Sequence, residues 1–297
     1  MKDKDYPNLY QAANIASVNY QKWYLQLMRA DLLSAILGAS LAIYNFQRAD
    51  YLMWVYVLSA FLFFITLICS IILFISKYED GWYQGRAMAE SCKTLTWRYI
   101  MQGEFFERHS DCYDIELIQP RFMKRIEEIE EEYADFVKKL DTRLLRLPYF
   151  TNEMERIRTW ELKERVDYYI KYRIEDQIDW YSKKERYNNR KYISWFIIIG
   201  ITQLLTLFFA VYLIVNPLSQ WNFVGLFSTI SASAMSWLQL KQHQGLKQAY
   251  TTAVMELNKI KTLSTEIKDN AAFAKFVLDS ENAISREHTL WIVQRRK

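Results

Sequence analysis

Three residues near the end of the chain belong to the types that hydrolytic enzymes combine: a carboxylate, a hydroxyl and an imidazole. Glu281, Ser285 and His288 follow one another at steps of four and three, so they share one face of a predicted helix with Trp291. Glu281 and His288 lie two turns apart, however, and no segment resembles a nucleophile elbow or an oxyanion hole. We therefore expect that the protein is not an enzyme and that this face docks on other helices.

Residues that could bind a metal ion or a cofactor are few and scattered. The three histidines form no pair at i,i+4 spacing: His109, His243 and His288. The three cysteines, an odd number without CxxC spacing, are Cys69, Cys92 and Cys112. Walker, GxGxxG and HExxH motifs do not occur in the sequence. The sequence therefore predicts no metal site and no cofactor.

A second set of residues with chemical potential lies between residues 82 and 97. Its members recur at steps of three and four, so they share one helical face: Trp82, Arg86, Glu90, Lys93 and Trp97. Arg86 and Glu90 form an i,i+4 pair of opposite charge. Two interpretations stay open for this face. It is either a salt-bridged surface or a face that packs on a partner helix or holds a ligand, together with Glu281, His288 and Trp291.

The elements that must position these residues are set by long uncharged stretches. Such stretches cover residues 32–47, 51–76 and 192–240, and the last is divided by the turn signal Asn216-Pro217. A helix needs about 20 apolar residues to cross a bilayer. The first stretch has only 16 residues, but it can span if the flanking arginines reach the headgroups. We predict four transmembrane helices in two hairpins, at 32–47, 51–76, 192–215 and 221–240; the alternative is a set of buried helices in a soluble protein.

The fold class follows from the same composition. The chain has 297 residues with only 7 glycines and 4 prolines, whereas an average chain has about 12% of these two types. Long, uninterrupted helices are therefore expected, with residues 78–102 continuing the second membrane helix into water. We predict an all-α integral membrane protein with four transmembrane helices in two hairpins and long cytoplasmic helical extensions.

Charge indicates the orientation and the partners. Lys and Arg number 4 in residues 1–30, 23 in 77–191 and 10 in 241–297, against one in the first turn and none in the second. The positive-inside rule then makes both termini and the long middle cytoplasmic. The net charge of +4 forms no basic stripe, so we expect the lipid bilayer as a partner and no nucleic acid.

Small residues recur along two of the predicted spans. Ser34, Gly38 and Ala42 lie at i,i+4 steps in the first, and the fourth carries Ser228, Ser231 and Met235 at similar spacing. Small residues allow helices to approach closely. The alternative is a mildly polar stripe that lines a pore.

Three segments resemble a known family. GWYQGRAMAESCKTLTWRY (81–99) follows an apolar hairpin, YRIEDQIDWYSKKERYNNRKY (172–192) precedes the other hairpin, and SENAISREHTLW lies at 280–291. They resemble the SLATT family, the SMODS- and SLOG-associating two-transmembrane effector domains, with two copies in one chain. The predicted division is a first SLATT-like unit at 1–112, a cytoplasmic helical insert at 113–165 and a second unit at 166–297.

The resemblance implies an effector of a bacterial antiviral conflict system in the inner membrane. Such proteins are expected to oligomerise and to form a pore or disrupt the membrane when infection is detected, which leads to abortive infection. No nucleotide synthase or SLOG sensor is recognised within these residues, so either a nucleotide signal or a soluble sensor protein is the expected trigger. The alternative is a non-conducting membrane scaffold whose cytoplasmic helices recruit a soluble defence partner.

Overall fold

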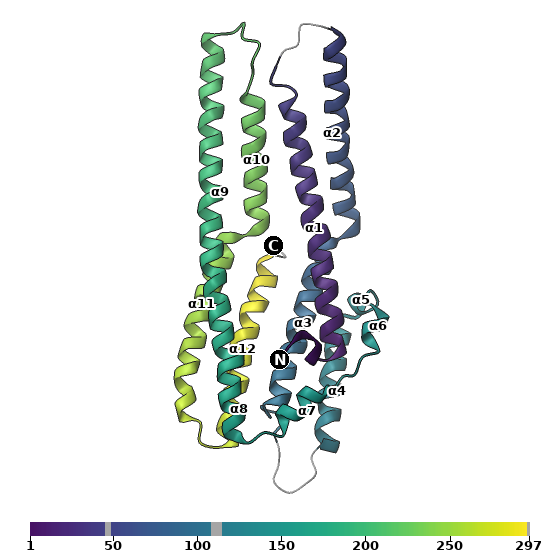
Figure 1. Ribbon diagram of the computed structural model, residues 1–297, viewed down its shortest axis with the longest axis vertical. Helices are drawn as coiled ribbons and strands as arrows, with labels where there is room; N and C mark the ends of the chain where they lie inside the picture. Colours follow the sequence, from purple (N-terminus) through teal and green to yellow (C-terminus); the bar gives the residue numbers. More distant parts are fainter. Residues whose placement is uncertain (45–48, 108–114, 296–297) are drawn as a thin grey trace. The chain divides into compact units, whose positions relative to one another are not determined.

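The computed structural model is helical throughout the part of the chain that it describes (Figure 1). It describes the backbone of residues 1–44, 49–107 and 115–295 and the side chains of 1–44, 51–107 and 118–285. Within these ranges it contains no strand, only one isolated bridge between Tyr44 and Trp221. The longer helices are α1 (Asn8–Ser40), α2 (Ala49–Ser76), α3 (Tyr78–Ile100), α4 (Ile115–Glu132), α9 (Asp176–Val215), α10 (Val224–Lys241), α11 (His243–Leu263) and α12 (Asn270–Arg295).

Short helices connect these elements. They are η1 (Asp3–Asp5), α5 (Ala134–Val137), α6 (Thr142–Leu145), α7 (Asn152–Arg158), α8 (Leu162–Tyr169), η2 (Ile170–Glu175) and η3 (Ser264–Glu266). Of these, η2 is a π-helical turn that leads without a break into α9. The all-helical prediction is therefore confirmed for the described residues.

The chain divides into two compact units, each built from separate stretches of sequence. Unit 1 contains residues 1–20, 79–185 and 247–297, and unit 2 contains residues 21–78 and 186–246. Both ends of the chain thus belong to unit 1. The chain passes from unit 1 to unit 2 and back twice.

Unit 2 exposes its large apolar side chains. The helical stretch Tyr51–Ser76 has a mean hydropathy of 2.8, and only 6% of its most apolar window is buried. Phe74 and Ile75 near the end of α2 are 84% and 70% exposed. A soluble core helix would bury these groups, because apolar area removed from water is the main stabilising term in folding. Among the described residues, the other helix of sufficient length and hydropathy is Leu162–Val215, a run through α8, η2 and α9.

The remaining two predicted spans are shorter than expected. Helix α1 ends at Ser40 rather than near residue 47, because the chain tightens into i→i+3 bonds, with the amide of Leu41 donating to Gly38 O and that of Ala42 to Ala39 O. Helix α10 has 18 residues. Residues 45–48 lie outside the described part. The two longest spans are confirmed as apolar helices, and the four-span arrangement stays a prediction.

One predicted continuation is wrong. The second membrane helix does not run on into residues 78–102, because Lys77 has a left-handed φ of 47° that separates α2 from α3. A non-glycine residue in this region ends regular helical hydrogen bonding. Helix α9, by contrast, is unbroken from unit 1 into unit 2.

Unit 1 has a core of aromatic and charged side chains. Trp97 on α3 is 2% exposed, and its indole Nε1 donates to Tyr6 Oη at 3.0 Å. Tyr99 packs on Phe122 with a ring separation of 4.9 Å. Arg158 and Arg165 are also buried, and Arg165 donates to Asn270 Oδ1 at 2.7 Å. Unit 1 is therefore packed like a water-soluble helical domain.

Candidate functional site

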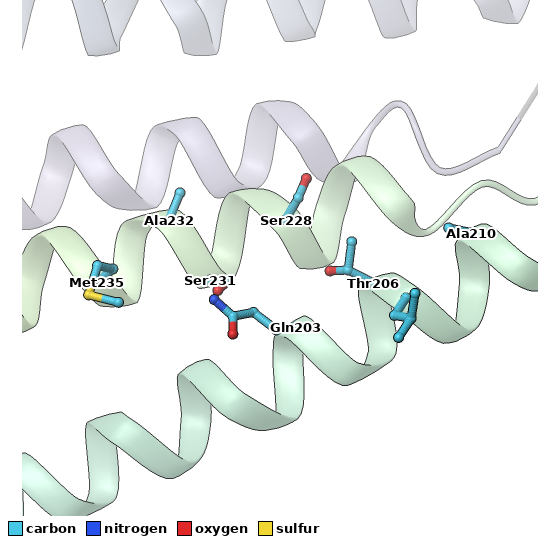
Figure 2. A pocket seen from close by; sticks show the side chains of 8 residues that line it. Gln203, Thr206, Ala210, Ser228, Ser231, Ala232 and Met235 are labelled. Carbon is cyan, nitrogen blue, oxygen red and sulfur yellow. The ribbon is translucent and has the colours of Figure 1, made fainter.

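A groove between α9 and α10 forms a concave site within unit 2 (Figure 2). Its volume is about 570 Å³. Four of its lining residues carry polar groups and four are apolar. The lining consists of Gln203, Thr206, Leu207 and Ala210 from α9 and Ser228, Ser231, Ala232 and Met235 from α10.

The spacing of these residues explains why they meet. The α9 residues follow one another at steps of three, one and three, and the α10 residues repeat that pattern, so each set occupies one helical face. Most of the α10 side chains in the groove are small, which leaves open space between the helices. The sequence thus builds a partly polar groove within otherwise apolar helices.

The polar groups of the groove differ in how they are satisfied. Thr206 Oγ1 donates to Thr202 O at 2.8 Å and Ser228 Oγ donates to Gly225 O at 3.0 Å, so these hydroxyls bond to their own helices. Gln203 is exposed, and its amide makes no hydrogen bond with any described residue. In Figure 2 its side chain extends from α9 toward Ser231 on α10. The Gln203 amide and the Ser231 hydroxyl, which also makes no hydrogen bond with a described residue, are the free hydrogen-bonding groups of this site.

The residues of the two predicted small-residue stripes have different places. Ser228, Ser231 and Met235 line the groove. Ser34 and Gly38 instead pack α1 on α2: the Ser34 and Thr66 hydroxyl oxygens lie 2.7 Å apart, and a Cβ on Gly38 would lie 3.1 Å from Phe63 Cζ.

Ala42 does not continue the stripe of Ser34 and Gly38, because it lies beyond the end of α1 in an exposed turn. This turn is instead held by the connection between α9 and α10, since the backbone N–H of Asn222 donates to Ile43 O at 2.6 Å. The expectation of an i,i+4 stripe through Ala42 is wrong.

A buried ion-pair cluster in unit 1 is the second chemically distinctive site. Arg173 Nη2 and Glu281 Oε2 lie 2.6 Å apart, and their side chains are 2% and 0% exposed. Arg173 Nε donates to Glu281 Oε1 at 2.8 Å, and the Tyr169 hydroxyl donates to the same oxygen at 2.9 Å. The Arg173 guanidinium also lies over the Trp97 ring, 5.7 Å from its centroid. We call Trp97, Tyr169, Arg173 and Glu281 the ion-pair cluster.

The π-helical turn η2 positions this cluster. It places Arg173 opposite Glu281 of α12, 108 residues further along the chain. Turns of this kind occur mostly as single insertions in α-helices, often at functional positions. The ion pair therefore joins the segment that leads into α9 to the C-terminal helix.

Burial and charge shift the acid–base behaviour of the cluster. Burial and the nearby Glu281 carboxylate raise the pKa of Tyr169 well above its ordinary value. Burial alone would lower the pKa of Arg173, but the ion pair with Glu281 outweighs it and keeps the guanidinium charged. Burial lowers the pKa of Lys93. The Arg173 guanidinium is therefore held in its charged form and the Tyr169 hydroxyl in its protonated form.

The predicted face on α3 is largely buried. Trp82 and Trp97 are in the core, and Arg86 Nη2 lies 2.7 Å from Glu90 Oε1, so the i,i+4 ion pair is formed. Glu281 meets this face through Arg173 and Trp97. The side chains of His288 and Trp291 lie outside the described residues, and so does Cys112. Whether the face holds a ligand stays a prediction.

Sequence reasoning missed Arg173, Tyr169 and Gln203. Arg173 lies in the segment 172–192 that carries the family resemblance, but a single sequence does not show a partner 108 residues away. Gln203 was visible as the strongest hydrogen-bonding side chain within the uncharged residues 192–215. A search for amides inside apolar spans would have found it.

Comparison with models of protein families shows which family the chain belongs to. The model described as SMODS and SLOG-associating 2TM effector domain 3 matches residues 7–166, more than half of the chain. The chain belongs to the SLATT family. Domain 1 of the same family matches residues 169–291, so the predicted presence of two SLATT copies is confirmed. No curated protein and no solved structure matches the chain.

The family description agrees with the exposed apolar helices of unit 2. Each SLATT domain is described as a two-transmembrane effector domain. The protein is accordingly a helical membrane effector. The predicted division at residues 112 and 165 stays a prediction.

Proposed function

We propose that this SLATT protein is the membrane effector of a bacterial antiviral conflict system. In this proposal several copies assemble in the inner membrane and open a polar pathway when infection is detected. The observation that supports it best is the unsatisfied Gln203 amide in the groove between α9 and α10. An amide without a partner is costly in hydrocarbon, because lipid tails offer no hydrogen bonds.

Gln203 therefore needs either water or a polar group from another copy. Water in the groove would make it part of a conducting pathway, and a second copy would make it part of an oligomer interface. A pore built from several copies meets both needs at once, since each groove then faces a common lumen. No Asp, Glu, Lys or Arg occurs between residues 192 and 240, so the pathway lacks the usual marker of an ion-coupled transporter.

The length of α10 supports a crossing in this assembly. Its 18 residues reach about 27 Å at ~1.5 Å per residue, which is close to the ~30 Å thickness of the hydrocarbon core. The part of α1 that follows Arg29, residues 30–40, is shorter, at about 17 Å. Its crossing therefore needs Arg29 to extend its side chain to the headgroups.

The proposed orientation places unit 1 in the cytoplasm. Unit 1 holds both ends of the chain, and the chain leaves it and returns twice, which fits two hairpins. Lys and Arg gather on this side of the sequence rather than in the two hairpin turns. A nucleotide signal or a soluble sensor protein acting on unit 1 would then provide the trigger.

Membrane depolarisation in bacterial cells tests the proposal. Expression of the chain together with its defence partners, followed by phage infection, is expected to depolarise the membrane, as measured with a potential-sensitive dye. Gln203→Leu is expected to reduce depolarisation at least tenfold, because it removes the polar group of the groove. Gln26→Leu is the matched control, since Gln26 is also exposed in unit 2 but does not line the groove.

A polarised membrane after infection, with the protein present at wild-type level, would reject a conducting effector. Equal depolarisation by Gln203→Leu and the wild type would remove the groove from the pathway. The scaffold alternative predicts no depolarisation and retention of a soluble partner in a pull-down of either variant.

A further inference from the structure

The two ends of unit 2 differ strongly in charge. Outside the turn between α1 and α2, unit 2 contains seven basic residues and one acidic residue, Asp31. Asp31 Oδ1 accepts a hydrogen bond from Ser70 at 3.0 Å. The seven basic residues lie where the helices of unit 2 connect to unit 1: Lys22, Arg29, Lys77, Arg186, Arg190, Lys191 and Lys241.

Two of these basic residues meet at one tryptophan. Arg29 Cζ lies 5.5 Å from the centroid of the Trp237 ring, and Lys241 Nζ lies 5.3 Å from the same centroid. The two positive charges are therefore no more than about 11 Å apart. Arg29 comes from α1, whereas Trp237 and Lys241 stand one turn apart at the end of α10.

The chemistry of this group calls for an anion. The ring attracts both cations through its π face but accepts none of the hydrogen bonds that a guanidinium can donate in its plane. In the described part of the chain, Arg29 forms no ion pair and the Trp237 indole N–H has no acceptor. Arg29 is also exposed. The free donors thus point to a ligand that only accepts hydrogen bonds.

The location selects the kind of anion. Tryptophan rings at the end of a membrane span lie at the level of the lipid headgroups. Phosphate groups of anionic lipids lie at the same depth and attract clustered Lys and Arg side chains. A guanidinium fork matches two oxygens of one phosphate, and a lysine adds a point charge.

We propose that Arg29, Trp237 and Lys241 form a binding site for the phosphate of an anionic phospholipid headgroup. The site joins α1 to α10, one helix from each hairpin, so a bound lipid would bridge the two hairpins of unit 2. The proposal requires that unit 2 lies in a membrane, but it does not require that the protein conducts.

Native mass spectrometry of the full chain in detergent tests this site. The purified protein is titrated with phosphatidylglycerol or with phosphatidylcholine, and the bound lipids are counted. Phosphatidylglycerol is expected to bind at least tenfold more tightly than the zwitterionic lipid. Arg29→Gln and Lys241→Gln are each expected to weaken its binding about fivefold, and the double variant by roughly 25-fold, from about 1 kcal/mol per basic residue.

Two control variants separate the site from general charge. Lys22→Gln removes one charge from the same region without touching Trp237, and it is expected to leave the affinity within twofold of wild type. Arg29→Lys combined with Lys241→Arg keeps both charges, and it is expected to retain lipid binding, which guards against misfolding of the glutamine variants.

Three results would overturn the proposal. The first is equal affinity for the two lipids, and the second is an equal loss of binding in Lys22→Gln and Arg29→Gln. The third is displacement of phosphatidylglycerol by inorganic phosphate at similar concentration, which would assign the site to a soluble phosphate. None of these results depends on conductance, so the pore proposal is tested separately.

Discussion

Units 1 and 2 use the same side-chain chemistry in opposite ways. Unit 1 buries its largest aromatic and charged groups, such as Trp97 and Arg173. Unit 2 exposes its large apolar groups, such as Phe74, and buries small polar residues, such as Ser231 and Ser34. The contrast indicates two different solvents, water around unit 1 and lipid around unit 2, for one continuous helical chain.

Hydrogen bonds show the same contrast. In unit 1, polar side chains link distant segments: the Tyr99 hydroxyl donates to Glu155 at 2.8 Å across 56 residues. In unit 2, most hydroxyls bond to carbonyls one turn back in their own helix, as Thr202 does with Ile198 at 2.9 Å. A helix in lipid must satisfy its polar groups internally, which makes the free Gln203 amide an exception.

The largest loss of stability is expected from a substitution that breaks the ion-pair cluster. Glu281→Ala leaves Arg173 buried without its counter-charge, so the free energy of unfolding is expected to fall by about 3–5 kcal/mol. Chemical denaturation of the detergent-solubilised protein, followed by tryptophan fluorescence of unit 1, measures the loss.

The matched control is an exposed ion pair in the same unit. Lys261 Nζ lies 2.6 Å from Glu175 Oε1 with both side chains accessible to water, so Lys261→Ala is expected to cost less than about 1 kcal/mol. Similar losses for Glu281→Ala and Lys261→Ala would show that the cluster does not hold α12 in place.

An intermediate effect on stability is expected when a glycine of each unit is replaced by alanine. A Cβ on Gly85 of α3 would lie 2.7 Å from Phe136 Cζ and 3.2 Å from Ala13 O, so Gly85→Ala is expected to destabilise unit 1 by about 1–3 kcal/mol. Gly200 of α9 has no described atom within 4 Å of such a Cβ. Gly200→Ala is expected to be neutral or to stabilise the helix by up to about 1 kcal/mol. Thermal melting of both variants tests this, and a destabilising Gly200→Ala would indicate that α9 is packed closely by another copy.

The smallest effect concerns the bond between Ser34 and Thr66 within unit 2. Ser34→Ala removes this bond between α1 and α2 and is expected to cost about 0.6 kcal/mol, the average for such bonds between membrane helices. Steric-trap unfolding in bicelles has the required precision. A loss above about 2 kcal/mol would mean that this hydroxyl pair, rather than the exposed apolar surface, organises the hairpin.

The sequence predicts the helices of this fold better than the points where they end and the contacts between them. Uncharged length located the span that ends at Ser76, and uncharged length together with the Asn216-Pro217 turn signal located the span that ends at Val215, because lipid imposes a length on a helix. It failed at Lys77, where a single left-handed residue ends α2, and at Ala42, where the chain turns early. Neither break involves the glycine or proline that usually marks one.

For each candidate site, the sequence predicted some of the residues but not those that another helix contributes. Ser231 was found because small residues follow helical periodicity, and Trp97 because its face does the same. Gln203, which lines the same groove as Ser231, and Arg173, which lies over the Trp97 ring, were missed. Helical periodicity relates residues a few positions apart, whereas these residues come from different helices.

Planar bilayer recording of the purified protein tests the central claim most directly. Addition of the activating signal or sensor protein is expected to open discrete conductance steps in wild type and in Gln26→Leu, and Gln203→Leu is expected to reduce them at least tenfold. A silent bilayer with correctly inserted, activated wild-type protein, or unchanged conductance in Gln203→Leu, would contradict a pathway through the α9–α10 groove.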